Sequence, residues 1–486
     1  QINQKRSVIM RKDVSEIKEV LDKHKFSIDS IIAVIMKEFN IKSICWRVGA
    51  KKEAGYSVTE VIALLIMLPL MLLKSIRSFY HSNYTNITSM KKDVIYRVLN
   101  NEKIPWRQLL YGVVKRFQTL VNPEKQVADN SAFIIDDTAD IRVGRKIENI
   151  SWVHDHTDHK TKFGFKHLFL GFFDGMSFIP IDFSVHSEKP LSLKQRKDQF
   201  QKEVKKGSNG DRRRKEVKVD KITNALLMLK RAVKKGFKAK YVLADSWFSS
   251  KKFIQTIRAV KHGAMHVICG IKNDKRKYEY NGKQLNAKQL QGAFKQEGHA
   301  KRSRRWNTRY YEVVVHYDGI GMVKLYICRF PYQKRWRIFL STDTSVTFAQ
   351  MMEIYSIRWT IEVFFREAKQ QLGLGKCKSR DFDAQIASIT IVCILYTLLA
   401  YYRRANDYET LGGLFAVIQD DVCQKNLAQR LWELFDELLQ VVITIISESG
   451  TVDITLFRES TEYQYIKSLF EESFLSSQFK MLNNAA

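Results

Sequence analysis

Two short apolar runs, each ended by an aspartate, constrain the fold of this chain most strongly. Phe133–Ile135 leads into Asp136, and Tyr241–Ala244 leads into Asp245. Compact runs of this kind are typical of buried strands, so both carboxylates are predicted to lie where a strand emerges from its sheet. A single aspartate in such a place is more often a turn or cap residue. Two of them together indicate an acidic sheet edge that can carry chemistry.

The segments around these runs predict an α/β fold. Phe165–Phe173 and Ser177–Val185 are rich in aromatic and apolar residues, and the Asp174-Gly175 pair between them predicts a hairpin. Helices are expected near Ile222–Val233 and from about residue 250 to 262. A hairpin followed by alternating helices and strands resembles the ribonuclease-H-like sheet, at the level of fold analogy.

A block of β structure is predicted between residues 264 and 342, and a long helix follows it. Thr347 and Gln350 match a capping-box pattern, so this helix is expected to run from about residue 347 to 371. The strand-like segments of the block are Met265–Gly270, Lys277–Tyr280, Tyr310–Tyr317, Met322–Phe330 and Trp336–Leu340.

The charge of the chain points to a polyanionic partner. Lys and Arg number 81 against 51 Asp and Glu, a net charge of +30, while 45% of residues are hydrophobic and can form a large core. Nucleic acid is the first candidate partner, before an anionic membrane surface. The basic residues are spread over several segments, which disfavours membrane binding. The apolar runs Val61–Leu73 and Ile386–Tyr402 are predicted to be buried helices, and six scattered cysteines indicate a reducing cytosol.

The densest positive charge lies between residues 201 and 220, where eight residues are Lys or Arg. The stretch Gly207-Ser208-Asn209-Gly210 among them predicts a mobile loop. Its three consecutive arginines, Arg212, Arg213 and Arg214, are therefore predicted to contact the DNA backbone.

The long helix carries four polar residues at a regular spacing. Tyr355, Arg358, Glu362 and Lys369 fall within one stripe about 60° wide at about 100° per residue. A carboxylate flanked by cationic and hydroxyl groups on one face would seat a metal ion and an adjacent phosphate. An intrahelical ion-pair network on a solvated face is the alternative interpretation.

This spacing resembles the Tyr-Arg-Glu-Lys helix signature of bacterial insertion-sequence transposases of the DDE class. Asp136-Asp137-Thr138 is similar to the first-acid pattern of that family, in which a Thr or Ser follows two residues after the Asp. Leu243–Phe248 is similar to its second-acid strand, and the block at 264–342 matches its β-rich insertion. The resemblance covers roughly residues 90–400.

The resemblance implies a ribonuclease-H-like catalytic core, a mixed five-stranded sheet with helices, and a metal-binding triad of Asp136, Asp245 and Glu362. The Asp-x-Thr pattern favours Asp136 over its neighbour Asp137 as the first acid. Two Mg²⁺ ions, with Mn²⁺ as a substitute, are the implied cofactors, since hard cations prefer carboxylate oxygens.

The resemblance also implies contacts with DNA. Tyr355, Arg358 and Lys369 correspond to positions that hold phosphates near the scissile bond, and Trp336 is the nearest candidate to stack on a flipped base. The implied partners are double-stranded DNA, comprising terminal inverted repeats and target DNA, and a second copy of the chain in a homodimer on DNA. The implied route is cut-and-paste transposition through a DNA hairpin, in the cytoplasm at the bacterial nucleoid.

Three regions are predicted along the chain. Residues 1–125 are expected to form a helical domain that recognises transposon ends, and within it the capping-box pattern of Ser57 and Glu60 precedes an apolar helix. Residues 126–405 form the catalytic domain with the β-rich insertion at about 264–342. Residues 406–486 form a helical region with dimerisation as a candidate role.

Two rival functions share the same sequence features. A metal-dependent nuclease with the same core would cleave DNA without joining it to a target. A transposase descendant that only binds a DNA sequence would lack one of the three acids, and all three are present. A membrane-surface protein is disfavoured by the distribution of its basic residues.

Overall fold

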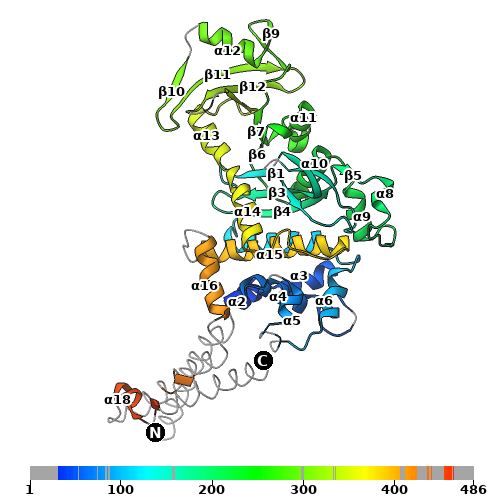
Figure 1. Ribbon diagram of the computed structural model, residues 1–486. Helices are drawn as coiled ribbons and strands as arrows, with labels where there is room; N and C mark the ends of the chain where they lie inside the picture. Colours follow the sequence, from blue (N-terminus) through cyan, green and yellow to red (C-terminus); the bar gives the residue numbers. More distant parts are fainter. Residues whose placement is uncertain are drawn as a thin grey trace. The chain divides into compact units, whose positions relative to one another are not determined.

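The computed structural model divides the chain into two compact units (Figure 1). One unit, called the sheet unit below, consists of Ile41–Pro69 and Lys74–Leu411, and the other consists of Gln1–Asn40, Leu70–Leu73 and Gly412–Ala486. The structure describes residues 31–52, 54–73, 75–82, 85, 88–155, 159–296, 300–331, 333, 335–405, 411–423, 435–436, 439, 454–461 and 463–464. Most of the predicted C-terminal region, 406–486, lies outside the described residues.

Thirteen strands of the described residues form one mixed sheet in the sheet unit. Its order is β5-β2-β3-β1-β6-β7-β13-β12-β11-β8-β9, with β4 paired to β3 and β10 paired to β11. The strand β1 is antiparallel to β3 and parallel to β6, which is parallel to β7. The bounds are β1 Ala132–Ile141, β2 Ser151–Asp155, β3 Lys160–Phe173, β4 Phe178–His186, β5 Lys189–Pro190, β6 Tyr241–Ala244, β7 His266–Ile271, β8 Lys277–Tyr280, β9 Lys283–Asn286, β10 Lys301–Ser303, β11 Thr308–Tyr317, β12 Gly321–Arg329 and β13 Arg337–Ser341.

The two apolar runs and the hairpin predicted from the sequence are confirmed. Phe133–Ile135 is fully buried within β1, and all four residues of β6 are buried. The strands β3 and β4 pair as an antiparallel hairpin whose turn includes Gly175 at a φ of 108°. Gly171 of β3 allows close packing, because a Cβ there would lie 2.1 Å from the ring of Phe178.

The predicted β block extends the same sheet, although the sequence predicted it as a separate insertion. All five predicted strand segments are found, but β7 pairs in parallel with β6 and therefore belongs to the central strands. The strand β13 then pairs with β7, and β12, β11, β8 and β9 continue the sheet outward. The strands β9 and β10 and the helix α12, Ala287–Gln296, were not predicted.

Helices cover both faces of the central strands. The helix α14, Trp359–Gln370, contacts β1, and its Phe364 and Phe365 pack on Phe169 of β3. The helix α10, Lys221–Lys234, contacts β3 and β4, and Lys221 at its start bonds to Asp137. Because successive strand residues point to opposite faces, Asp136 faces α14 and Asp137 faces α10.

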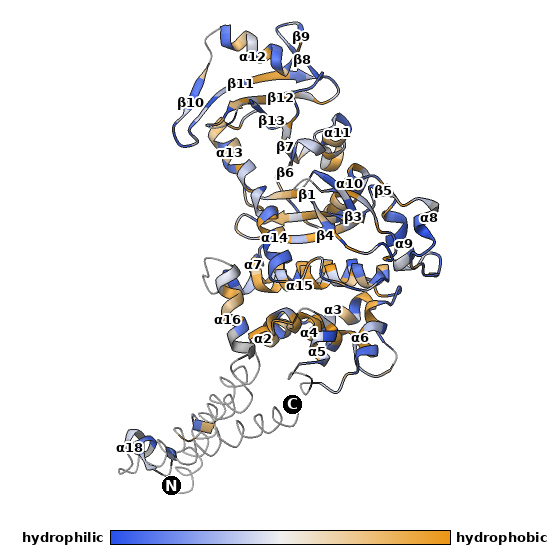
Figure 2. Ribbon diagram, viewed as in Figure 1, coloured by the Kyte–Doolittle hydropathy of each residue, from blue (hydrophilic) through white to orange (hydrophobic). Residues whose placement is uncertain are grey.

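The longest described helix, α15 (Phe382–Ala405), is a core helix. It is long and apolar enough to cross a membrane, yet 89% of its most apolar window is buried inside the protein. It contacts β4 and the helix α7, Trp106–Val121. Figure 2 shows hydrophobic residues along α15 and along α4, Val58–Leu70. The prediction of buried helices at these two apolar runs is confirmed.

Two local details of the helical regions test the sequence patterns. The capping box is confirmed, since Ser57 N–H donates to Glu60 at 2.6 Å and Glu60 N–H donates to Ser57 Oγ at 3.2 Å. The prediction of a mobile loop throughout 201–220 is wrong, because residues Asn209–Glu216 form the helix α9. Ser208 caps α9 by accepting from Asp211 N–H, so the Gly-Ser-Asn-Gly stretch begins a helix.

Candidate active site

Asp136 and Asp245 lie side by side at one edge of the sheet. Ile135 of β1 and Ala244 of β6 are the last pair of their parallel ladder, so Asp136 and Asp245 follow it side by side, Asp245 after the end of β6 and Asp136 within β1, where it is still paired with Phe169 of β3. Neighbouring strands lie about 4.8 Å apart, which brings the two carboxylates within reach of one ligand. The sequence predicted this edge from the apolar runs alone.

Arg358 joins two of the predicted acids. Its Nη1 donates to Asp136 Oδ2 at 3.0 Å, and its Nη2 donates to Glu362 Oε1 at 2.5 Å. The guanidinium side chain is 15% exposed, and burial there strengthens the attraction between opposite charges. The structure therefore gathers Asp136, Glu362 and Arg358, which are separated by up to 226 residues in the sequence.

The predicted continuous helix is interrupted next to this arginine. Thr347 caps the helix α13, Phe348–Ser356, with the expected capping box, but the helix ends at Ser356 and α14 starts at Trp359. The prediction of one helix from 347 to 371 is therefore wrong at residues 357–358. The break does not separate Arg358 from Glu362, because four residues still make one helical turn.

Tyr355 lies at the same edge, beside the turn after β6. Its ring packs edge-on against Phe339 of β13 with centroids 4.9 Å apart, and its hydroxyl lies 3.6 Å from where a Cβ of Gly270 would be. The same Cβ position is 3.6 Å from Ser246, the residue after Asp245. Burial, opposed by the charge of Arg358, raises the pKa of Tyr355, so its hydroxyl remains a neutral donor.

Lys369 is tied to the end of β1. Its Nζ donates to Thr138 Oγ1 at 2.7 Å and to the carbonyl of Ala139 at 2.9 Å. Thr138 is the threonine of the first-acid pattern, so the structure gives that residue a physical role: it anchors α14 to the strand that carries Asp136.

A second cluster lies behind the site, on the other face of β1. Asp137 accepts from Lys221 at 2.5 Å and lies 3.8 Å from the buried Lys166. Lys221 also lies 4.1 Å from the ring centroid of Trp247, which comes two residues after Asp245 and is 43% exposed. Sequence analysis missed Lys166 and Lys221, because nothing local distinguishes a buried lysine from a solvated one. The side chain of Asp137 therefore points away from Arg358, whereas that of Asp136 faces Arg358.

The electrostatics of Asp136 favour the arrival of a cation. Burial, opposed by Arg358 and reinforced by the nearby Asp245, raises the pKa of Asp136 to about 7. Near neutral pH the carboxyl group is therefore divided between its two forms, and an additional positive charge would favour the ionised form.

The donor set fits a hard divalent cation. Asp136, Asp245 and Glu362 offer only carboxylate oxygens, which Mg²⁺ and Mn²⁺ prefer. Within the described ranges no three His, Cys, Asp or Glu residues are already gathered as a metal cluster. Glu362 bonds to Arg358 through one oxygen, so to share a cation with the two aspartates it would use its second oxygen or turn away from the guanidinium.

Trp336 lies just before β13, in the outer part of the sheet. It is half-buried and stacks on Tyr311 with centroids 5.5 Å apart, and Arg329 lies 6.0 Å from its ring centroid. No contact of Trp336 with the three acids is found in the described part of the chain. Two other tryptophans flank the acids and are more exposed, Trp247 and Trp359, the latter 59% exposed directly after Arg358.

The three arginines of α9 have different environments, and the structure corrects their shared prediction. Arg213 is buried, donates to the Phe183 carbonyl at 2.8 Å and pairs with Glu216 at 3.2 Å. Arg214 pairs with Glu148 and Asp383. Of the three, only Arg212 is exposed, so in the folded protein it alone can contact a phosphate.

In the comparison with known proteins, one family model matches part of the chain. Residues 215–398 match the transposase DDE domain. The matched segment contains Asp245, Glu362 and the other three residues of the helix pattern, whereas Asp136 lies before it. No curated protein matches the chain. The predicted resemblance to DDE transposases is thus supported at the level of the domain.

Proposed function

We propose that this protein is a DDE transposase that cleaves DNA at the ends of a mobile element and joins the freed ends to target DNA. One observation carries the proposal: Asp136 and Asp245 directly follow the last pair of the parallel ladder between β1 and β6, and Arg358 links Asp136 to Glu362. The match of residues 215–398 to the transposase DDE domain supports it independently.

The strand arrangement supports a ribonuclease-H-like core for this activity. The strands β4, β3, β1, β6 and β7 are neighbours in that order. The pairs from β4 to β1 are antiparallel, and the pairs from β1 to β7 are parallel. The sequence resemblance implied a mixed five-stranded sheet with two acids on neighbouring strands and a third on a covering helix; here Asp136 lies within β1, Asp245 follows β6 and Glu362 lies on α14.

Asp136, Asp245 and Glu362 are the residues that would hold two Mg²⁺ ions, or Mn²⁺ in their place. Such ions supply activation of the attacking oxygen and stabilisation of the leaving oxygen in an in-line displacement. Arg358, once Glu362 has turned away, directs its N–H groups at a phosphate oxygen beside Asp136.

Other side chains of the helix pattern orient the DNA and the site. Tyr355 presents a neutral hydroxyl at the edge where Asp245 lies, as a phosphate donor. Lys369 holds β1 through Thr138 and adds positive charge near the scissile phosphate. Trp336 is the proposed platform for a base unstacked when the freed 3′-hydroxyl attacks the opposite strand to form a hairpin, since base stacking on an aromatic ring contributes about 1–3 kcal/mol.

The remaining regions complete the proposal. The helices within residues 1–125 recognise terminal inverted repeats, residues 126–405 catalyse, and residues 406–486 contribute to a homodimer on DNA. The net charge of +30 supports a double-stranded DNA partner, in the cytoplasm at the bacterial nucleoid.

The experiment is a cleavage assay on end-labelled duplex that carries the inverted repeats flanking the gene, with Mg²⁺ or Mn²⁺ and a denaturing gel. Alanine at Asp136, Asp245 or Glu362 is expected to abolish cleavage while DNA binding persists. Asp137→Ala is the matched control, because this neighbouring acid faces the other side of β1; it is expected to cleave.

The same gel separates the alternatives. Cleavage by the wild type without joining to a target duplex would indicate the nuclease. Double-strand breaks with no hairpin at any time would refute the role of Trp336. Full activity in Glu362→Ala would overturn the proposed function.

A further inference from the structure

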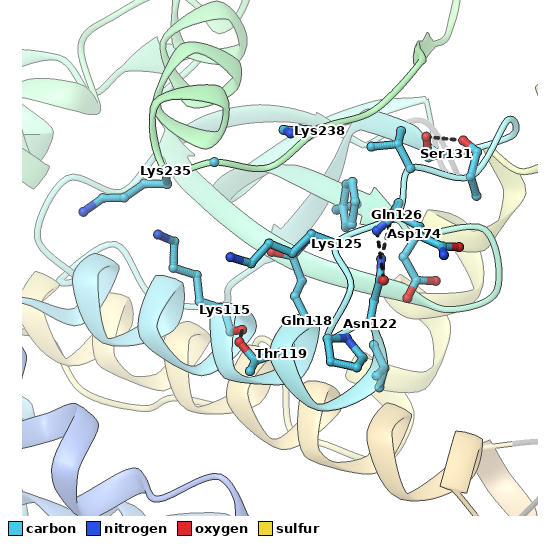
Figure 3. A pocket seen from close by; sticks show the side chains of 16 residues that line it. Lys115, Gln118, Thr119, Asn122, Lys125, Gln126, Ser131, Asp174, Lys235 and Lys238 are labelled. Atoms are coloured by element: carbon cyan, nitrogen blue, oxygen red, sulfur yellow. Dashed lines mark hydrogen bonds between the residues drawn. The ribbon is translucent and has the colours of Figure 1, made fainter.

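A basic groove lies at the opposite edge of the sheet from the acids. Two adjoining hollows form it, of about 350 Å³ and about 690 Å³, and Lys115, Thr119 and Lys235 line both. Figure 3 shows the first hollow, in which the amino groups of Lys115, Lys125 and Lys235 are directed to the same side. Five of the basic residues that line this groove are Arg47, Lys115, Lys125, Lys235 and Lys238.

The charge of the basic groove is uncompensated. All five residues are exposed, and none of them makes an ion pair among the residues that the structure describes. The acid that lines the groove, Asp174, is engaged by Arg404 at 2.6 Å. By contrast, Arg107, Arg213 and Arg214 elsewhere in the sheet unit are each paired with a carboxylate.

The backbone holds the basic groove in shape. Gly112 of α7 brings the helix α3, Ile41–Val48, close, because a Cβ there would lie 2.5 Å from Ile44. Gly236, at a φ of 91°, turns the chain between Lys235 and Lys238. Lys125 itself has a φ of 56°, a left-handed conformation that is strained for a residue with a Cβ.

The backbone position of Lys125 therefore suits a substitution. Glycine or asparagine would adopt such a backbone conformation with less strain, so Lys125 can be replaced by glycine to remove its charge without straining the backbone. The loop around it is also fixed, since Asn122 donates to the Gln126 carbonyl at 2.7 Å and accepts from its N–H at 3.1 Å.

We propose that the basic groove binds the phosphate backbone of duplex DNA away from the DNA held by the acids. This inference rests on the proposed function for the identity of the polyanion. The basic groove is lined by residues of α3, α7 and the turn after α10, so it suits a run of successive phosphates better than a single anion.

The basic groove is electrostatically separate from the acids. Ser131, which lines it, and Asp136 are five residues apart on one extended segment, about 17 Å at about 3.3 Å per residue. That distance exceeds the Debye length of about 8 Å at physiological salt. Neutralising the groove is therefore expected to weaken binding without changing the chemistry at the acids.

The test measures the affinity of the full chain for a fluorescent 40-bp duplex in EDTA, between 50 and 300 mM salt. Lys115, Lys125, Lys235 and Lys238 are changed together to Gln. The control variant carries the same four-charge change at exposed lysines of the outer sheet, Lys277, Lys283, Lys288 and Lys295.

The groove variant is expected to lower the slope of log affinity against log salt by about 3–4, because each phosphate contact contributes about 0.9. An equal change in both variants, or none in the groove variant, would overturn the inference. The single substitution Lys125→Gly, which relieves the left-handed backbone, is expected to keep the melting temperature and lower the slope by about 0.9; an unchanged slope would exclude Lys125 from the contact.

Failure of the proposed function gives a different result. If the wild type does not cleave DNA with Mg²⁺ while the groove variant still loses its salt slope, the basic groove binds DNA and the catalytic proposal is wrong. If cleavage is normal and the slope is unchanged, only the basic groove is refuted.

Discussion

Removing the charge of Asp182 is expected to destabilise the sheet unit strongly. This carboxylate of β4 is 1% exposed and accepts from Arg107 at 2.9 Å, Arg231 at 2.9 Å and the Tyr111 hydroxyl at 3.1 Å. It therefore joins α7, α10 and the sheet through buried polar bonds. The substitution Asp182→Asn keeps the shape of the side chain and removes its charge.

The structure gives the magnitude. Burial raises the pKa of Asp182, but attraction to Arg107 and Arg231 outweighs it and lowers the pKa to about 2. A shift from 3.8 to about 2 corresponds to about 2.5 kcal/mol of stability. The asparagine also takes from Arg107 and Arg231 one of their two carboxylates, although both still pair with Glu216, so a total loss of about 3 kcal/mol is expected, the lower end of the usual range for breaking a buried pair. At roughly 1.3 °C per kcal/mol for a unit of about 370 residues, the melting temperature should fall by roughly 4 °C.

The assay is thermal unfolding followed by circular dichroism at pH 7, with Asp318→Asn as the control. Asp318 makes an equally short ion pair, 2.6 Å from Lys251, but its side chain is 85% exposed, so its loss should leave the melting temperature unchanged. The stabilisation by Asp182 is present above the unfolded pKa of about 4 and is lost as the pH falls through the folded pKa, so the two proteins should converge near pH 2. Equal shifts in both variants, or none in Asp182→Asn, would refute the reasoning.

Two further predictions concern the strand β3. Burial lowers the pKa of His167 to about 4, below its unfolded value of 6.5. Between pH 7 and pH 5 only the unfolded chain therefore gains the proton, and the stability of the wild type should fall by about 2 kcal/mol. In urea unfolding, His167→Gln should lack this part of the pH dependence, and an unchanged pH dependence would contradict the prediction. Gly171→Ala should lower the free energy of unfolding by about 1–3 kcal/mol, because the new Cβ would lie 2.1 Å from the ring of Phe178; wild-type stability in urea would show that β3 and β4 can shift apart freely.

The local order of the sheet unit could be predicted from the sequence, because each feature depends on neighbouring residues. Apolar runs identified β1 and β6, and the Asp174-Gly175 pair identified the hairpin of β3 and β4. The contact between Arg358 and Glu362 also follows from helical spacing, since residues four apart share a face.

Features that depend on distant neighbours could not be predicted in this way. Periodicity reports whether a strand is buried and not which strand lies beside it, so the sequence did not reveal that β13 pairs with β7. Charge composition likewise does not distinguish solvated arginines from paired ones. Arg213 and Arg214 pair with acids near and far in the chain, and of these three arginines only Arg212 remains exposed.

The sequence by itself determined which residues carry the candidate chemistry, and the tertiary structure decided how they meet. Asp136 and Asp137 are adjacent and chemically identical, and although the Asp-x-Thr pattern of the family favours Asp136, their own chemistry does not separate them. The pleat of β1 does, because it directs Asp136 to Arg358, 222 residues away, and Asp137 to Lys221 on the opposite face. That choice depends on which helix covers each face of the sheet, and packing over the whole sheet unit sets it.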